Sequence, residues 1–291
     1  TLVVDGNIET MTAAKEQQHN NAPLGENQGR GVASAFWINV GGETSCAVSL
    51  LEDGSVMVTS GSPDIGGSRA SLCNMAAEVL GCDVENVKAI IADTSSLGFN
   101  RHTGGSRVTF AAGIVVTDAT KDMVQQLRER AALSWDFDVD AVEWADGEAC
   151  PAGPNAGEFE PLTLADIAGK TLETGGPINA KKSMNVQAPG PAFGTHIVDV
   201  EVDKDTGHVT ILRYTAVQDV GKAVHPSYVE GQIQGGAAQG VGWALNEEYI
   251  YDDQGRMENP GFLDYRIPVA SDLPFIDAVI VRCQTHYIPL E

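Results

Sequence analysis

Apolar and polar residues alternate along two stretches of the chain, 44–51 and 56–60, which flank the dipeptide Asp53-Gly54. This pattern predicts a β-hairpin with its turn at the dipeptide. A stripe of apolar residues at helical spacing follows, and an apolar run over 87–92 predicts a further strand. The stripe consists of Leu72, Met75, Ala76, Val79 and Leu80. A hairpin, a helix and a strand are therefore expected in succession.

The same order of patterns returns in the second half of the chain. Residues 197–202 and 208–216 flank a polar turn at 203–207, and a helix is predicted to start near His225-Pro226. The apolar face of this helix would comprise Val229, Ile233, Ala237, Val241 and Ala244. We infer an α+β fold with two related subdomains, each a β-hairpin followed by a helix and further strands.

The segments outside these repeats have weaker patterns. Residues 1–30 are polar, with helical spacing around 8–15, and predict an N-terminal helix and linker. The rest of the chain would divide near residues 175–190. This gives a first subdomain at 31–180 and a second at 181–291, truncated at its C-terminus.

Three elements are predicted between the repeats. Residues 118–133 indicate an amphipathic helix that ends in basic residues, which suits the negative end of the helix dipole. Residues 145–161 are rich in glycine, proline and acidic side chains and indicate a surface loop. Residues 163–169 indicate a short helix capped by Thr163.

The chain is strongly acidic, because 40 Asp and Glu residues outnumber 18 Lys and Arg and give a net charge of -22. Nucleic acid and anionic membrane surfaces would be repelled, since phosphate binding depends on Lys and Arg displacing counterions. Partners are expected to be proteins or small molecules. No apolar run approaches the ~20 residues that span a bilayer, and no signal-peptide pattern is present.

The five cysteines are odd in number and scattered, at positions 46, 73, 82, 150 and 283. No C-x-x-C motif and no paired histidine spacing accompanies them. Neither a disulfide scaffold nor a zinc or iron–sulfur site is indicated, and no residue of this chain is assigned as a metal ligand.

Two glycine-rich loops each join Gly-Gly to Ser-Arg ahead of a helical pattern: GSPDIGGSRA at 61–70 and RHTGGSRVT at 101–109. Backbone N–H groups, a hydroxyl, a guanidinium and a helix N-terminus together can hold an anion. Alternatively, the glycines only serve turns, and Ser68 or Ser106 only caps a helix. The repetition favours a ligand with more than one anionic or polar end, because arginine binds phosphate bidentately.

A third feature is the segment GQIQGGAAQGVGWALNEE at 231–248. Its four central glycines fall where the pattern predicts a helix, and each should cost roughly 1 kcal/mol relative to alanine. Close helix packing would explain them. Equally, a large flat ligand could approach this face, with Gln232 or Gln239 supplying amide hydrogen bonds.

Read together, these segments resemble the molybdopterin-binding subunit of the xanthine dehydrogenase/aldehyde oxidase family, the molybdenum hydroxylases, over residues 29–281. The most specific matches are DIGGSRAS followed by AAEVLG, then IADTSSLGFNRHTGGSRVT, then the segment that begins QDVGKAVHPSYVEGQIQGGAAQG. Their shared order and spacing make the resemblance specific. It implies a fold of the molybdenum cofactor-binding type, in which both subdomains bind molybdopterin.

The resemblance further implies that the loops hold a molybdopterin dinucleotide, in its cytosine form, with the pyrophosphate as the anion and the pterin as the flat group. Gln232 matches a glutamine beside the metal, and Gly67 stands where many members have glutamine. The residues implied to bind the cofactor are Gly66, Gly67, Ser68, Arg69, Thr103, Gly104, Gly105, Ser106, Arg107, Thr109, Gln232 and Gln239.

The implied reaction is hydroxylation of an aldehyde or an N-heteroaromatic compound with oxygen from water, with electrons leaving through iron–sulfur clusters and FAD on partner chains or domains. The family's general-base glutamate belongs to a G-V-G-E motif that these 291 residues lack, and Glu291 is not assigned that role. The chain is therefore expected to be a fragment or one piece of a split subunit, and inactive alone.

The expected partners are the rest of the molybdenum subunit, an iron–sulfur subunit, an FAD subunit and a small-molecule substrate. A cytoplasmic location is expected, or a periplasmic one if a partner carries an export signal. Two other interpretations remain open. The chain could be a non-catalytic scaffold or assembly module of the same fold, or an unrelated anion-binding protein.

Overall fold

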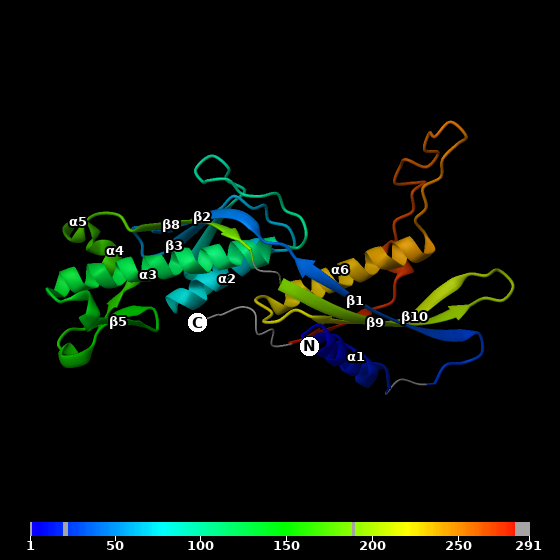
Figure 1. Cartoon of the computed structure of the whole chain (residues 1–291), viewed down its shortest axis with the longest axis horizontal. Helices are drawn as coiled ribbons and strands as arrows, with labels where there is room; N and C mark the ends of the chain where they lie inside the picture. The colour runs from blue at the N-terminus through cyan, green and yellow to red at the C-terminus, as the bar shows by residue number, and fades with distance from the viewer. Residues whose placement is uncertain (1, 20–22, 188–189, 283–291) are drawn as a thin grey trace. The chain divides into compact units, whose positions relative to one another are not determined.

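The computed structural model describes residues 2–19, 23–187 and 190–282 (Figure 1). Contacts divide the chain into two compact units. The central unit is Asn39–Gly190, and the terminal unit combines Thr1–Ile38 with Pro191–Glu291. Each unit has its own β-sheet and its own hydrophobic core.

The central unit contains the predicted succession of hairpin, helix and strand. β2 (Gly42–Leu50) and β3 (Val56–Ser60) pair antiparallel, and α2 (Ser68–Leu80) leads to β4 (Val87–Ile91), which lies parallel to β3. A fourth strand, β8 (Asn179–Val186), completes a sheet of order β4-β3-β2-β8. The hairpin forms where Gly54, with φ of 81°, provides the turn.

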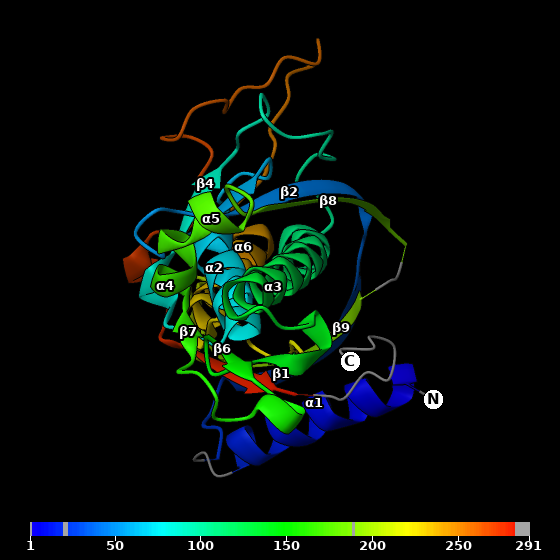
Figure 2. The ribbon, with the colours of Figure 1, turned by 90° about the vertical axis from the view of Figure 1, so that its left-hand side faces the viewer.

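The helices α2 and α3 (Gly113–Trp135) lie side by side against one face of this sheet (Figure 2). Their apolar stripes and the inward residues of the strands form the core, which includes Val48, Val58, Leu72, Met123 and Leu127. A π-helical turn at Val108–Ala112 precedes α3. Since α3 continues to Trp135, its last turn holds no basic residue, and the predicted basic end is wrong.

A small sheet occupies the segment that was predicted to be a surface loop. β5 (Val142–Ala145) and β6 (Glu148–Pro151) form a hairpin around Asp146-Gly147, and β7 (Leu162–Thr163) pairs with β6. Both turn residues have positive φ, as a two-residue hairpin turn requires. The glycine and acidic residues thus make the turn of a hairpin, which composition alone did not reveal.

Two short helices follow β7. Thr163 caps α4 (Leu164–Gly169) through a reciprocal pair of hydrogen bonds with Asp166, which confirms the predicted cap. The second is α5 (Thr171–Thr174). Single 3-10 turns lie at Val84–Asn86, Val139–Ala141, Gly153–Asn155 and Ala270–Asp272.

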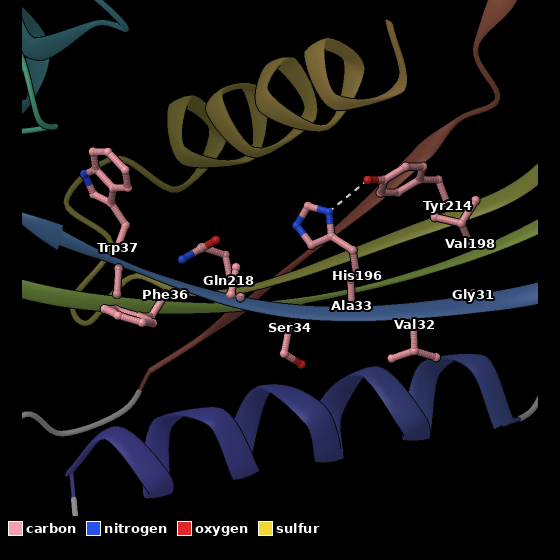
Figure 3. Close-up of a pocket in the computed structure, with 13 residues that line it drawn as sticks. Gly31, Val32, Ala33, Ser34, Phe36, Trp37, His196, Val198, Tyr214 and Gln218 are labelled. Atoms are coloured by element: carbon pink, nitrogen blue, oxygen red, sulfur yellow. Dashed lines mark hydrogen bonds between the residues drawn. The ribbon is translucent and has the colours of Figure 1, made fainter. Parts of the chain in front are cut away.

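The terminal unit repeats the plan of the central unit. Its hairpin of β9 (Gly190–Val202) and β10 (Val209–Asp219) leads through α6 (Pro226–Leu245) to β11 (Ile276–Val281), which lies parallel to β10. β1 (Gln28–Asn39) borders β9, so the order is β1-β9-β10-β11. The helix α1 (Leu2–His19) contacts β10 and β11 from the face opposite α6 (Figure 3). The expected α+β fold with two related halves is confirmed.

These units divide the chain differently from the limits predicted at 30/31 and 180/181. β1 belongs to the terminal unit because it pairs with β9, although the whole central unit separates them in sequence. β8 belongs to the central unit because it pairs with β2, with Gly42 opposite Val186. Pairings between segments so far apart leave no signal in a local pattern.

The cysteines that the structure describes carry free thiols. Cys46 and Cys73 are buried, whereas Cys82 and Cys150 are half-buried. Burial raises the pKa of the Cys46 thiol to about 12, which removes it from thiolate chemistry at neutral pH. Cys283 and Glu291 lie outside the described residues.

Candidate functional site

The two arginine loops begin at the same edge of the central sheet. β3 and β4 are parallel, with Ser60 opposite Ile91, so the loop after each strand leaves from the same side. The backbone N–H of Ala92 donates to the carbonyl oxygen of Ser62 at 3.2 Å. A Cβ added to Gly61 would lie 2.5 Å from Asn100 Nδ2. The structure therefore brings together the two loops that the sequence singled out.

In both helical segments that follow these loops, the N-cap residue provides no side-chain hydrogen bond. The N-cap of α2 is Gly67, with φ of 80°, and the N-cap of the π-helical turn is Arg107. The hydroxyl of Ser68 donates to the carbonyl oxygen of Pro63 at 3.2 Å, and Ser106 has φ of 57°. Neither serine caps a helix in this structure. The N–H groups and partial positive charges of two helical N-termini thus lie at one sheet edge.

Arg69 faces outward but has a partner in its own loop. Its backbone N–H donates to Asp64 Oδ1 at 2.9 Å, and its Nε lies 3.3 Å from Asp64 Oδ2. The Arg69 side chain is 59% exposed. An external anion at the start of α2 would therefore compete with Asp64 for these donors.

Arg107 points inward. This corrects the sequence-based expectation that its guanidinium would bind a phosphate bidentately. The side chain is 1% exposed, and burial, helped by the charge of Arg101, lowers the pKa of its guanidinium. All three guanidinium nitrogens donate within the chain, to the carbonyl oxygens of Gly41, Gly42, Glu43 and Arg101 and to Thr44 Oγ1. The guanidinium is therefore bound to the chain through each of its three nitrogens, and it fixes the loop against the start of β2.

Arg101 is the arginine of this loop that sequence reasoning missed. It is exposed, and its backbone N–H donates to the carbonyl oxygen of Glu43 at 2.9 Å. Within the described ranges its guanidinium has no hydrogen-bond or ion-pair partner. The motif RHTGGSR contains two arginines, and spacing alone does not show which of them turns inward.

Each loop also contains a buried hydroxyl group that lacks a hydrogen bond. Ser62 Oγ and Thr103 Oγ1 are covered yet have no partner among the described residues. The Ser62 residue is 2% exposed. Buried polar groups are nearly always hydrogen-bonded, so each hydroxyl is a place where a bound polar group would restore a missing contact.

In the terminal unit, α6 presents an open face of glycines. Gln232, Gly235, Gly236, Gln239 and Gly240 are all exposed. A Cβ added to any of these three glycines would meet nothing within 4 Å. Close helix packing therefore does not explain them in this structure.

The opposite side of α6 packs on the sheet. Ala237 and Val241 are buried there, but Ala244, which the pattern also assigned to this face, is exposed. Gly242 differs from the open glycines, because a Cβ there would meet Glu247 Oε1 and lie 2.7 Å from Pro268 Cδ. One glycine of the helix is thus required by packing, and the other four, which include Gly231, are open.

The molybdopterin cofactor-binding domain family matches residues 6–274. Among curated proteins, the chain is 32% identical over 250 residues to the putative xanthine dehydrogenase molybdenum-binding subunit of Escherichia coli K12, covering 84% of this chain and 33% of that protein. It is 32% identical over 242 residues to the nicotine 6-hydroxylase large subunit of Paenarthrobacter nicotinovorans, covering 79% and 29%. The chain spans about a third of the length of these relatives.

Solved structures share the fold. Quinoline 2-oxidoreductase from Pseudomonas putida 86 superposes with a TM-score of 0.84 at 23% identity, over 98% of this chain and 40% of that one. A Cu,Mo-CO dehydrogenase superposes with a TM-score of 0.82 at 20% identity, over 97% and 38%.

Proposed function

Because the chain belongs to the molybdopterin cofactor-binding family of molybdenum hydroxylases, we propose that it holds the cofactor of an enzyme that hydroxylates an aldehyde or an N-heteroaromatic compound with oxygen from water. The observation that carries this proposal is the sheet edge where the two loops meet. The N-termini of two helical segments lie in these loops, as do the hydroxyls of Ser62 and Thr103, which have no hydrogen bond within the described residues. A phosphate-bearing ligand would satisfy both kinds of group.

In the central unit, the loops would hold the phosphate and nucleotide end of a molybdopterin dinucleotide. Gly66 to Arg69 and Thr103 to Ser106, with Thr109, would line it, and Arg101 would add an exposed positive charge. Arg107 would act as a positioning residue, because its guanidinium is committed to the chain. The fit of the cofactor to these loops rests on polar groups that lack hydrogen-bond partners, and not on bidentate binding of phosphate by an arginine.

In the terminal unit, the glycine face of α6 would admit a flat group such as the pterin. Gln232 and Gln239 stand on this exposed face and would direct amide donors and acceptors toward it. The bound cofactor would supply the oxygen-transfer and two-electron chemistry. Gln232 would lie beside the metal as a hydrogen-bond donor, and none of the described residues is assigned as general base.

We also propose the cytosine form of the dinucleotide, and as partners the rest of the molybdenum subunit, an iron–sulfur subunit and an FAD subunit. The relatives' names support a multi-subunit enzyme, since they are called molybdenum-binding or large subunits. No helix in the described ranges has the length and apolar composition to cross a bilayer. The cytoplasmic location stays a prediction.

The decisive experiment measures what the assembled molybdenum-binding subunit contains. Molybdenum by elemental analysis and cytidine monophosphate released by acid should each approach one per chain, and oxidation of aldehydes or N-heterocycles should follow with an artificial electron acceptor. This chain alone should show no such oxidation. A folded subunit without molybdenum or nucleotide would favour the scaffold or assembly module and reject the proposal.

A further inference from the structure

Strand β1 is an edge strand with exposed residues on both faces. It stands first in the order β1-β9-β10-β11, and every residue from 30 to 38 is exposed. Val32, Phe36 and Trp37 are 57–60% exposed. Val32 and Ser34 point to the α1 side of the sheet and Trp37 to the α6 side (Figure 3), yet α1 and α6 contact β10 and β11.

The exposure of β1 does not reflect a loose strand. Arg30 binds both carboxylate oxygens of Asp199 on β9, at 2.6 and 2.9 Å, and Arg213 on β10 binds the same carboxylate at 2.8 Å. The hydroxyls of Ser34 and Thr195 are 2.9 Å apart and hydrogen-bonded. β1 is thus held in place, and its single charged side chain is already ion-paired.

A hollow of about 600 Å³ lies beside β1 on the α6 side of the sheet (Figure 3). Its floor is made of small residues, including Ala33, Ala35 and Gly194. His196 Nδ1 is hydrogen-bonded to the Tyr214 hydroxyl at 2.9 Å, and burial lowers the pKa of His196. The hollow is therefore uncharged at neutral pH, on a chain whose net charge is -22. A scarcity of charged residues and the presence of tryptophan are typical of the centres of protein interfaces.

The edge strand β8 of the central sheet shows what a water-facing edge looks like in the same protein. β8 occupies the position next to β2 that β1 occupies next to β9. It carries Lys181 and Lys182, and its residues largely alternate between exposed and covered. Lysines on an edge strand discourage pairing with another strand. β1 has no lysine and exposes apolar residues instead.

We propose that β1 and its hollow receive an extended segment of the molybdenum-binding subunit from outside this chain. The segment pairs with the outer edge of β1 and inserts an apolar side chain into the hollow. The length of the relatives supports this occupant, because the matched region is 33% of the E. coli subunit. The partner's identity rests on the proposed function, whereas the location of the surface rests on β1 alone.

Hydrogen exchange tests the proposal on the unaltered protein. Backbone amides of residues 30–38 should exchange at least about tenfold more slowly in the assembled molybdenum-binding subunit than in this chain alone. The amides of β4, an edge strand of the central sheet, serve as the internal control. Equal exchange of β1 in both samples would overturn the proposal. Slow exchange of β1 in the chain alone would also overturn it if light scattering gives that chain a dimeric mass, because the occupant would then be a second copy.

A variant pair tests the hollow. Trp37→Asp should weaken association with the rest of the subunit by roughly tenfold or more, while Leu172→Asp, at a residue 94% exposed in α5, should leave it unchanged. If Trp37→Asp lowers the thermal stability of the chain alone, the hydrogen-exchange measurement on the unaltered protein decides whether β1 is an interface. Molybdenum is measured in the same samples. Slower exchange of the β1 amides in an assembled subunit that contains no molybdenum would reject the proposed function and keep this interface. Molybdenum in an assembled subunit whose β1 amides exchange as fast as in the chain alone would reject the interface alone.

Discussion

Arg107 Nε donates to the carbonyl oxygen of Gly41 at 2.7 Å, across 66 positions of sequence. The same guanidinium reaches three further carbonyl oxygens and one hydroxyl, so a single side chain fastens the second loop to the start of β2. The loop is therefore ordered by the fold before any ligand arrives, which lowers the entropy that binding must offset.

Replacing Arg107 with alanine should destabilise the central unit. Several buried carbonyl oxygens would lose their donor, and we expect a decrease of about 3 kcal/mol in the free energy of unfolding. Arg256→Ala is the control, because the Arg256 side chain is 75% exposed and forms an ion pair with the nearby Asp252; its effect should stay within about 0.5 kcal/mol. Denaturant unfolding measures both. Unchanged stability combined with loss of cofactor would restore the direct phosphate role.

Arg101→Gln should reduce cofactor content while the fold stays intact. Arg101 is exposed, and loss of a charge-assisted bond to phosphate removes roughly 1.5–3 kcal/mol of binding. Lys88→Gln is the matched control, since Lys88 lies near the opposite end of the same paired strands. Molybdenum and cytidine monophosphate per chain provide the measurement. Equal contents in the two variants would remove Arg101 from the site.

Gly236→Ala should stabilise the chain and still impair cofactor binding. The position is helical and open, so alanine should add about 1 kcal/mol to the free energy of unfolding. A methyl group would at the same time obstruct a flat ligand on this face. Gly242→Ala should instead destabilise, because its Cβ would lie 2.7 Å from Pro268 Cδ. A stabilised Gly236→Ala protein with full cofactor content would leave the open glycines unexplained.

Gln232→Leu should lower the rate per molybdenum atom without lowering molybdenum content. The Gln232 side chain is exposed and has no hydrogen bond within the described part of the chain, so the fold does not depend on it. Removing one donor aimed at developing charge in a closed site typically reduces kcat by about 10²-fold. The measurement is kcat of the assembled enzyme, normalised to molybdenum. A value within a few-fold of the unaltered enzyme would remove Gln232 from the reaction site.

His196 should make the terminal unit less stable in mild acid. Burial lowers its pKa in the folded chain below the value of 6.5 for an ordinary histidine, so the unfolded chain binds the proton first as the pH falls. Stability is therefore unaffected above about pH 6.5 and declines below it, with a slope of at most about 1.4 kcal/mol per pH unit. His196→Gln should remove this contribution between pH 6.5 and 5. Parallel stability curves for the two proteins would contradict the assignment.

The sequence predicted the plan of the fold better than the details of the site. The hairpin, helix and strand at 44–92 are adjacent in sequence, so local periodicity was enough to predict them, and the meeting of the two loops follows from parallel strands. The inward turn of Arg107 could not be predicted, because it depends on carbonyl oxygens at 41–43. The dipeptide Asp146-Gly147 is typical of a hairpin turn, but the composition around it indicated a loop.

The pairing of β1 with β9 has a consequence for the order in which the protein forms. Arg30 and Asp199 are 169 residues apart, and the complete central unit is synthesised between them. The central unit can condense on the ribosome as soon as β8 has emerged, whereas β1 must wait for β9. Contacts of such long range are slow to form, and an unpaired apolar strand is prone to aggregate. We therefore expect the terminal sheet to close last, which makes β1 the segment most dependent on chaperones during synthesis.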